Sequence, residues 1–157
     1  MQGEWLRRGQ NLLITGPCGS GNVRWATRPV CKDVARATTG CASAAGADSG
    51  QGRRGSYARL LGQLAKVDLL ILDDWGLETV NAQQRNGLLE VMDDRYGKYS
   101  TVVVSQLPTE EWHASLGGNT LADAILDRLM HNAHRLQLKG ESMRKRRGLL
   151  TDAEQSS

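Results

Sequence analysis

A glycine-rich segment that follows a short apolar run constrains the fold of this chain more than any other feature. The run is Asn11-Leu12-Leu13-Ile14-Thr15, and the residues after it read Gly-Pro-Cys-Gly-Ser-Gly-Asn-Val. A buried parallel strand that ends in such a loop is typical of a phosphate-binding P-loop, whose backbone N–H groups cradle phosphate oxygens. The candidate phosphate-binding residues are therefore Gly16, Pro17, Cys18, Gly19, Ser20, Gly21, Asn22 and Val23.

Two positions of this loop depart from the pattern that contacts nucleotide. The pattern is G-x-x-x-x-G-K-[ST], in which the Lys neutralises the β- and γ-phosphates and the hydroxyl holds Mg²⁺. Asn22 and Val23 occupy those two positions. Asn is neutral and too short to span the phosphates, and Val has no oxygen for a metal. The loop scaffold is predicted to persist while its chemistry is weakened.

An acidic pair follows the next apolar run. Residues 67–72 have the composition of a buried strand, and Asp73 and Asp74 come directly after them, followed by Trp75-Gly76. This is a Walker B pattern, in which the first carboxylate holds Mg²⁺ and the second orients water at the carboxyl end of a parallel strand. The alternative is a strand-ending turn, because Asp and Gly favour turns. Two motifs in the expected order favour the nucleotide interpretation.

Strand-like and helix-like stretches alternate along the rest of the chain. Besides the run before the P-loop, the predicted strands are residues 67–72, 101–104 and 135–138. Apolar residues at helical spacing predict helices over residues 56–65, 83–96, 109–116 and 121–131. This alternation predicts an α/β fold, with a parallel sheet and helices on both faces.

Residues 24–54 do not fit this alternation. They show no sustained helical or strand periodicity, and Pro29 falls where the helix after a P-loop should run. Proline inside a helix costs about 3 kcal/mol or more, because it removes a backbone donor and clashes with the preceding turn. The first helix and the second strand are therefore expected to be disrupted.

Length and charge limit the classes of protein. The 157 residues fit one domain, the net charge is +3, and no long apolar run or signal peptide is present, so we expect a cytoplasmic chain with no membrane partner. A basic cluster over residues 139–147 includes Arg144 and could meet the phosphates of nucleotide or DNA, although a solvated tail explains it equally well. The three cysteines lack metal-ligand spacing and are expected to be free thiols.

Several blocks together resemble the IstB-like family of transposition helper ATPases. These are residues 16–21, 56–61, 69–77, 105–108, 121–129 and 139–147, within about three quarters of the chain. The family belongs to the AAA+ P-loop ATPases and is related to DnaC-like helicase loaders. The resemblance implies a protein that binds ATP and Mg²⁺ and assembles on DNA to assist the transposase of an insertion sequence.

The resemblance also implies how the chain is organised. An IstB-like domain over residues 1–150 would contain an anomalous segment over residues 22–54, and residues 151–157 would form a polar tail. Full-length members of the family carry an N-terminal DNA-binding region. Because Met1 lies just before the first strand, this chain is expected to lack that region.

Particular residues take roles from the resemblance. Asp73 is the implied metal ligand, and Asp74 and Arg128 are the implied catalytic residues, Arg128 as an arginine finger offered to a neighbouring subunit. Ser105 or Gln106 resembles the polar sensor of the γ-phosphate, with a strand-end cap as the alternative. For Arg128 the alternative is a salt bridge on its own helix. Asp127 is adjacent and does not face it, which leaves only a poor pairing with Asp123.

The lack of periodicity in residues 24–54 suggests a hypothesis about the encoding DNA. Trp25 requires the codon TGG, and a reading frame one base earlier permits the sequence Leu-Gly-His-Ala-Ala-Cys-Val-Gln-Gly. That sequence resembles the helix after the P-loop in the IstB-like family. Two compensating frameshifts, one near Asn22 and one before Gly55, would then explain the segment. Sequencing the gene tests this hypothesis, because its alternative frame must encode a family-like helix.

Three functions remain open at this level. The chain could be an ATP-dependent transposition helper with an impaired site, or a catalytically dead remnant. It could also be a non-catalytic module that binds DNA or protein through Arg128 and the basic cluster. The departures at Asn22 and Val23 leave open whether this chain hydrolyses ATP.

Overall fold

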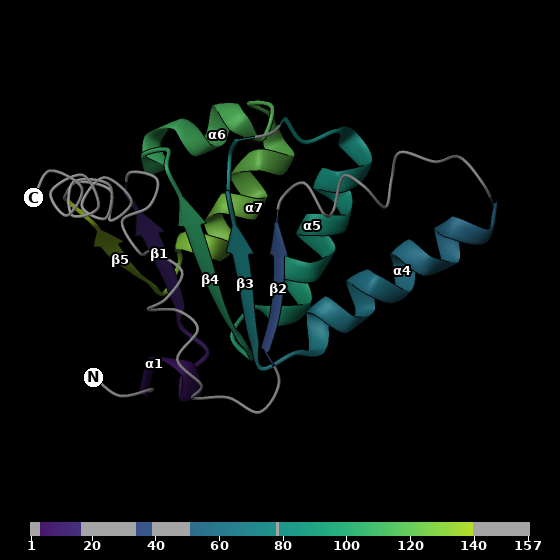
Figure 1. Cartoon of the computed structure of the whole chain (residues 1–157), viewed down its shortest axis with the longest axis horizontal. Helices are drawn as coiled ribbons and strands as arrows, with labels where there is room; N and C mark the ends of the chain where they lie inside the picture. Colours follow the sequence, from purple (N-terminus) through teal and green to yellow (C-terminus); the bar gives the residue numbers. More distant parts are fainter. Residues whose placement is uncertain (1–3, 17–33, 39–50, 78, 140–157) are drawn as a thin grey trace, which may run out of the picture.

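Five short strands form one parallel sheet in the computed structural model (Figure 1). The structure describes residues 4–16, 34–38, 51–77 and 79–139. In spatial order the strands are β2 (Val34–Thr38), β3 (Leu69–Asp73), β4 (Ser100–Ser105), β1 (Asn11–Thr15) and β5 (Ala133–Gln137). Each neighbouring pair is parallel. The carboxyl ends of all five strands therefore meet at one edge of the sheet.

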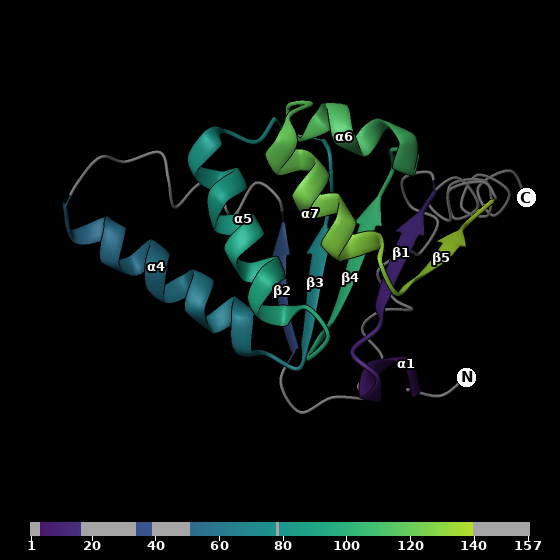
Figure 2. The ribbon, with the colours of Figure 1, turned by 180° about the vertical axis from the view of Figure 1, so that it is seen from behind.

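The helices confirm the predicted α/β class. They are α1 (Glu4–Arg7), α4 (Gln51–Lys66), α5 (Ala82–Arg95), α6 (Trp112–Ser115), which follows the 3-10 turn η1 (Thr109–Glu111), and α7 (Thr120–Met130). Seen from behind in Figure 2, α5 and α7 lie across one face of the sheet, with α6 near the carboxyl ends of the strands. Helix α4 packs against α5.

Alternation along the central strands divides the core between the two faces. Leu70, Leu72 and Val103 point to the side covered by α5, α6 and α7, where they join one buried cluster. Ile71 and Val102 point to the other side, where Trp5 and Leu6 of α1 pack against them. Strands buried on both faces read as continuous apolar runs, which is why the sequence predicted them.

Side-chain caps fix where the two sheet-covering helices begin. At α5, the Asn81 side chain accepts from the Gln84 backbone N–H at 2.9 Å, and the Gln84 side chain accepts from the Asn81 N–H at 2.7 Å. At α7, the Asn119 side chain accepts from the Ala122 N–H at 3.0 Å. Each cap satisfies backbone donors that a helix start leaves unpaired.

The expected loss of the second strand is not found. Val34–Thr38 form β2, which pairs with β3 from Val34 opposite Leu69 to Thr38 opposite Asp73. Hydrogen bonds to β3, which is buried at every position, stabilise β2 as a strand. Such tertiary stabilisation cannot be seen in the periodicity of the β2 sequence. The expectation for the first helix concerns residues that lie outside the described part of the chain.

A close contact between α4 and α5 gives a stability prediction. A Cβ atom on Gly87 would lie 2.6 Å from the Tyr57 hydroxyl oxygen and 2.9 Å from Leu61 Cδ1. Tyr57 is buried, so Gly87→Ala should lower the free energy of unfolding by about 1–2 kcal/mol despite the better helix propensity of Ala. Urea unfolding measures this change.

The Tyr57 hydroxyl provides the matched test of that contact. It has no hydrogen-bond partner among the described residues. Adding Tyr57→Phe to Gly87→Ala removes the clashing oxygen and should recover about half of the lost stability. If the double variant is no more stable than Gly87→Ala alone, the clash does not cause the loss.

Candidate functional site

Most of the described residues in the predicted site meet at the carboxyl edge of the sheet. The register places Thr15 of β1 opposite Ser105 of β4, and Asp73 ends the neighbouring strand β3. Gly16, Asp74 and Gln106 directly follow these three strand ends. Ligands of open α/β sheets bind at this edge, outside the carboxyl ends of the strands.

Gly16 begins the P-loop under tight steric constraint. Its N–H donates to the Ser105 carbonyl at 3.1 Å, which joins the loop start to β4. A Cβ atom at position 16 would lie 2.9 Å from the carbonyl oxygen of Leu138 and 3.0 Å from its Cβ. Leu138 itself donates to the Thr15 carbonyl at 2.7 Å. Only glycine therefore allows the end of β5 to approach the loop this closely.

The acidic pair occupies a sharp turn. Asp73 is almost fully buried, and its Oδ1 accepts from the Asp74 backbone N–H at 3.0 Å. Asp74 has φ of +55° and Gly76 has φ of +83°. A left-handed conformation is uncommon for a residue with a Cβ, and such residues concentrate at functional sites. The turn leaves the Asp74 side chain exposed at the edge of the sheet.

Two buried tryptophans, Trp75 and Trp112, pack next to this turn. The Trp75 backbone N–H donates to the Val104 carbonyl at 3.0 Å, and the Trp75 ring lies 5.7 Å from that of Trp112. Trp112 Nε1 donates to the Leu107 carbonyl at 3.1 Å. Both rings are fully buried, so they pack in the core and do not form an exposed stacking surface.

The two candidate sensor residues differ sharply in their surroundings. Ser105 is buried, its hydroxyl donates to the Trp75 carbonyl at 2.6 Å, and the same oxygen accepts from the Leu107 N–H at 3.0 Å. A hydroxyl has one proton to donate, so Ser105 has none left for a phosphate. Gln106 is exposed at the carboxyl edge and carries amide donors.

Arg128 lies at the opposite edge from the acidic pair. It is in the last turn of α7, which continues into the amino end of β5. Its Nε donates to the Asp93 carboxylate of α5, and its Nη1 donates to the Ala124 carbonyl at 3.3 Å. The hydrogen bond that Arg128 donates to the Asp93 carboxylate raises the pKa of Arg128. Arg128 is therefore permanently charged. It does not contact the Asp73-Asp74 turn of the same chain.

The expected alternative partners of Arg128 need correction. Asp123 instead lies 3.0 Å from His113 Nε2, and the Asp127 carboxylate is 4.0 Å from Arg128 Nη1. The principal partner, Asp93, was missed because it lies on another helix. Helical spacing describes neighbours within one helix and carries no information about contacts between helices.

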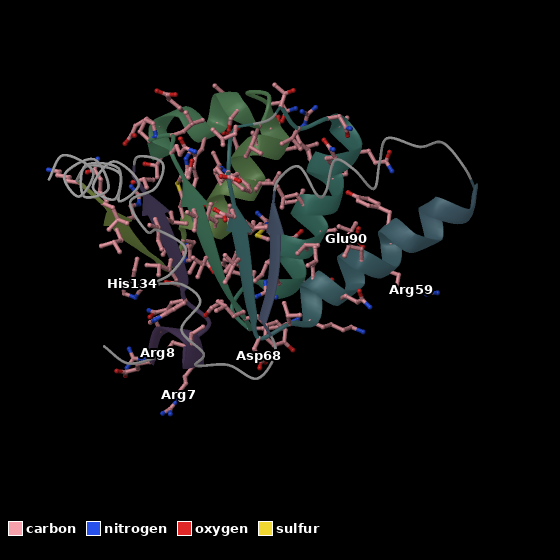
Figure 3. All side chains as sticks on the ribbon, in the orientation of Figure 1. Arg7, Arg8, Arg59, Asp68, Glu90 and His134 are labelled. Carbon is pink, nitrogen blue, oxygen red and sulfur yellow. The ribbon has the colours of Figure 1, made fainter. Side chains whose placement is uncertain are left out.

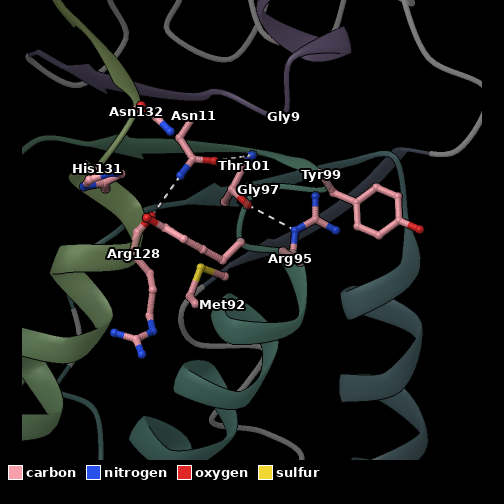
Figure 4. A pocket seen from close by; sticks show the side chains of 11 residues that line it. Gly9, Asn11, Met92, Arg95, Gly97, Tyr99, Thr101, Arg128, His131 and Asn132 are labelled. Carbon is pink, nitrogen blue, oxygen red and sulfur yellow. Dashed lines mark hydrogen bonds between the residues drawn. The ribbon is translucent and has the colours of Figure 1, made fainter.

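A pocket at the amino edge contains two further residues that sequence reasoning missed (Figure 4). Asn11 donates to the carbonyls of Arg128 and Leu129 at 3.2 and 3.1 Å, and its Oδ1 accepts from the Thr101 N–H at 2.9 Å. Arg95 is fully buried, and its Nε donates to Thr101 Oγ1 at 3.1 Å. An Asn at the start of a strand and an Arg at a helix end are ordinary sequence features, so neither gave a signal.

The remaining candidates lie outside the described residues. These are Pro17, Cys18, Gly19, Ser20, Gly21, Asn22, Val23 and Arg144. The described chain ends at Lys139, immediately after Leu138, which packs against Gly16. The basic cluster that begins at Lys139 therefore starts next to the P-loop.

The carboxyl edge suits a magnesium-bound phosphate better than a metal held by protein alone. Mg²⁺ binds through one or two carboxylates together with substrate phosphates and waters, and Asp73 and Asp74 offer such carboxylates. No group of three or more His, Cys, Asp or Glu side chains in the described ranges could hold a metal. Within the same ranges, no helix is both long and apolar enough to cross a bilayer.

Solved structures with a similar arrangement support the fold. The DnaC helicase loader superposes with a TM-score of 0.64 at 16% identity, over 85% of this chain and 81% of that one. AMPPCP-bound DnaA from Aquifex aeolicus superposes with a TM-score of 0.65 at 17% identity, over 88% of this chain and 44% of that one. This chain therefore shares the fold of these two proteins.

Sequence comparison identifies the family. The insertion sequence ATP-binding protein y4pL of Sinorhizobium fredii (strain NBRC 101917 / NGR234) is 47% identical over 154 residues, which cover 91% of this chain. The chain spans about 60% of the length of this relative and of a second one from the same organism. The family model of the IstB-like ATP binding protein matches residues 2–151. The chain therefore belongs to the IstB-like ATP-binding protein family.

Proposed function

We propose that this chain is an ATP-binding AAA+ subunit that assists an insertion-sequence transposase on DNA, with a nucleotide site weakened at Asn22 and Val23. The observation that carries the proposal is the Asp73-Asp74 turn at the carboxyl edge, on the strand next to β4 and at the same edge as Gly16. The name of the relative y4pL supports ATP and an insertion sequence as the context.

Each described residue of the edge has a role in this proposal. Gly16 lets the loop turn from β1 toward the phosphates. Asp73 would hold Mg²⁺, and Asp74 would orient the attacking water. When bound, Mg²⁺ supplies neutralisation of phosphate charge. The turn at Asp74 fixes the backbone from which both carboxylates project, which limits the reorganisation needed on binding.

We assign the sensor role to Gln106 and a supporting role to Ser105. Contact with a γ-phosphate requires a donor, and Gln106 presents amide donors from an exposed position. Ser105 instead connects the Walker B turn to β4 through its bond to the Trp75 carbonyl. A change of the Gln106 position on binding phosphate would therefore be transmitted to the Asp73-Asp74 turn through Ser105.

The partners follow from the two charged regions. Arg128 would act on the nucleotide of a second copy, because it lies at the edge opposite its own acidic turn. Arg144 and the basic residues around it would contact ATP phosphates or DNA, since this cluster starts beside the P-loop. The transposase of the same insertion sequence is the proposed protein partner.

A second function is favoured by a specific observation. Asn22 and Val23 remove the ammonium and the hydroxyl that contact nucleotide and metal in a P-loop. A non-catalytic module would retain self-association and DNA binding through Arg128 and the basic cluster without any need for ATP. Binding of DNA that is independent of nucleotide distinguishes this function from the first.

Titration with Mg-ATP tests the proposal. We expect weak, saturable binding with Kd on the order of 1 mM, about −4 kcal/mol, because backbone donors remain while the Lys and hydroxyl are absent. Asp73→Asn removes the proposed metal ligand and should weaken binding about 10-fold, or about 1.4 kcal/mol. Isothermal calorimetry at high protein concentration measures both values.

The same titration separates the sensor candidates. Gln106→Ala should weaken binding of Mg-ATP and leave Mg-ADP binding unchanged, because only ATP has the γ-phosphate. Ser105→Ala should instead lower stability, since it leaves the buried carbonyl of Trp75 without its donor. Absence of saturable Mg-ATP binding in the parent chain would reject the ATP-dependent function in favour of the second one.

A further inference from the structure

Arg128, at the amino edge, uses only two of the three nitrogens of its guanidinium group in hydrogen bonds with described residues. Arg128 Nε donates to Asp93, and Nη1 donates to the Ala124 carbonyl of its own helix. Nη2 forms no hydrogen bond with any described residue. Figure 4 shows the side chain leaving α7 and pointing away from Asn11. The side chain is 33% exposed, so its outer edge remains accessible while its inner edge is fixed.

This arrangement preorganises the side chain for contact with an anion. A free arginine loses about 2 kcal/mol of rotamer freedom when it is immobilised. The Asp93 carboxylate and the Ala124 carbonyl already restrict Arg128 from two helices. Phosphate oxygens are bound by the paired N–H groups of a guanidinium, and the outer Nη2 edge supplies such donors.

We propose that Asp93 is a positioning residue that holds Arg128 in the orientation in which it contacts the nucleotide phosphates of a second copy of this chain. The inference rests on the proposed function, since it needs nucleotide at the carboxyl edge of that copy. It adds a role for Asp93, which acts only through Arg128.

Charge favours a second copy as the partner. The carboxyl edge carries Asp73, Asp74, Glu110 and Glu111, and bound nucleotide would add phosphate charge. Arg128 and His131 lie at the amino edge, where the exposed Tyr96 ring is 5.8 Å from the His131 ring. Exposed carboxylates of Asp93 and Asp127 flank Arg128 at this edge. The guanidinium of Arg128, rather than the charge of the whole amino edge, therefore complements the carboxyl edge of a second copy head to tail. Arg and Tyr are also the residue types enriched where interfaces derive most of their binding energy.

Self-association of the full chain with Mg-ATP tests the role of Asp93. Asp93→Ala should weaken Mg-ATP-dependent association about 10-fold in sedimentation velocity, because Arg128 then samples many rotamers. Asp93→Asn keeps an oxygen acceptor for Nε and should lose less than about 3-fold. Arg128→Ala should lose at least as much as Asp93→Ala, and the double variant should lose no more than Arg128→Ala, because Asp93 acts only through Arg128.

Two controls separate positioning from a general effect. Asp94 has the same charge one position further on, and its side chain forms no hydrogen bond or ion pair with any described residue, so Asp94→Ala should associate like the parent. The NMR signal of Arg128 Nε–H in the unassociated chain should be protected from solvent exchange in the parent and lose that protection in Asp93→Ala. This signal does not depend on nucleotide.

The outcomes distinguish this inference from the proposed function. No saturable Mg-ATP binding by the parent rejects both. Normal Mg-ATP binding without self-association rejects the inference alone. Association of Asp93→Ala that equals or exceeds that of the parent also rejects it, and tighter association would show that Asp93 instead restrains Arg128.

Discussion

Replacing two loop residues, Asn22→Lys together with Val23→Thr, is expected to tighten Mg-ATP binding by about 100-fold or more. The Lys would place a positive charge against the β- and γ-phosphates, and the Thr hydroxyl would add an oxygen ligand for Mg²⁺. A 100-fold change corresponds to about 2.7 kcal/mol, which is modest for an ammonium and a metal ligand acting together. Calorimetric titration of parent and variant measures the change.

A third variant shows whether residues 24–54 also limit the site. This variant carries the same two substitutions and has residues 24–54 replaced by the sequence of the alternative frame. If the two substitutions alone restore tight binding, the loop side chains are the only defect. If only the third variant binds, the helix after the loop is also required. Equal binding by parent and variants would show that the backbone of the loop is sufficient.

Most strands of the sheet could be predicted because their own residues indicate a strand. Residues 67–72, 101–104 and 135–138 were expected as strands, and β3, β4 and β5 occupy Leu69–Asp73, Ser100–Ser105 and Ala133–Gln137. Buried parallel strands are continuous apolar runs, and β3 and β4 are buried at every position. The exceptions are β2, whose pairing with β3 is not encoded in a run of this kind, and β5, which is largely exposed.

The site could be predicted only in part. Motif order placed Gly16 and Asp73 at one edge of the sheet, and the structure places them there. The proposed division of roles between Ser105 and Gln106 could not be predicted. It depends on the Trp75 carbonyl, which takes the only proton of the Ser105 hydroxyl from 30 residues away. The role of each thus follows from tertiary contacts.

The amino edge shows the same limit more strongly. Asp93, Asp94 and Arg95 are consecutive charged residues, which in sequence indicate a solvated helix end. In the structure, Asp93 contacts Arg128, Asp94 is exposed and Arg95 is fully buried. Successive positions on a helix are about 100° apart around its axis, so these three charged side chains lie in three different environments. Only the packing of α5 reveals which one carries which role.

Removing the guanidinium of Arg95 is expected to cause the largest loss of stability of any single substitution considered. Its Nη1 donates to the carbonyls of Leu64 and Val67 at 2.9 and 2.7 Å, and its Nη2 donates to the Ser100 carbonyl. These bonds join the end of α4 to α5 and to the start of β4. Burial lowers the pKa of Arg95 to about 10, so the group remains charged at neutral pH.

Arg95→Met keeps most of the buried stem and removes every donor. One buried and two part-buried carbonyls then lose their partner, at about 1–3 kcal/mol for a buried group, so the free energy of unfolding should fall by about 3–5 kcal/mol. Urea unfolding followed by the fluorescence of the buried tryptophans measures this loss. Arg59 provides the matched control, because Figure 3 shows its side chain pointing away from the sheet.

Arg59→Met should change stability by less than about 0.5 kcal/mol, as expected for an exposed position. Arg95→Lys keeps the charge but supplies three donors from one atom, which cannot reach oxygens on α4, the following turn and β4 together. It should therefore recover less than half of the loss. A loss below about 1 kcal/mol for Arg95→Met would mean that water replaces the guanidinium, and that the three elements are joined by apolar packing alone.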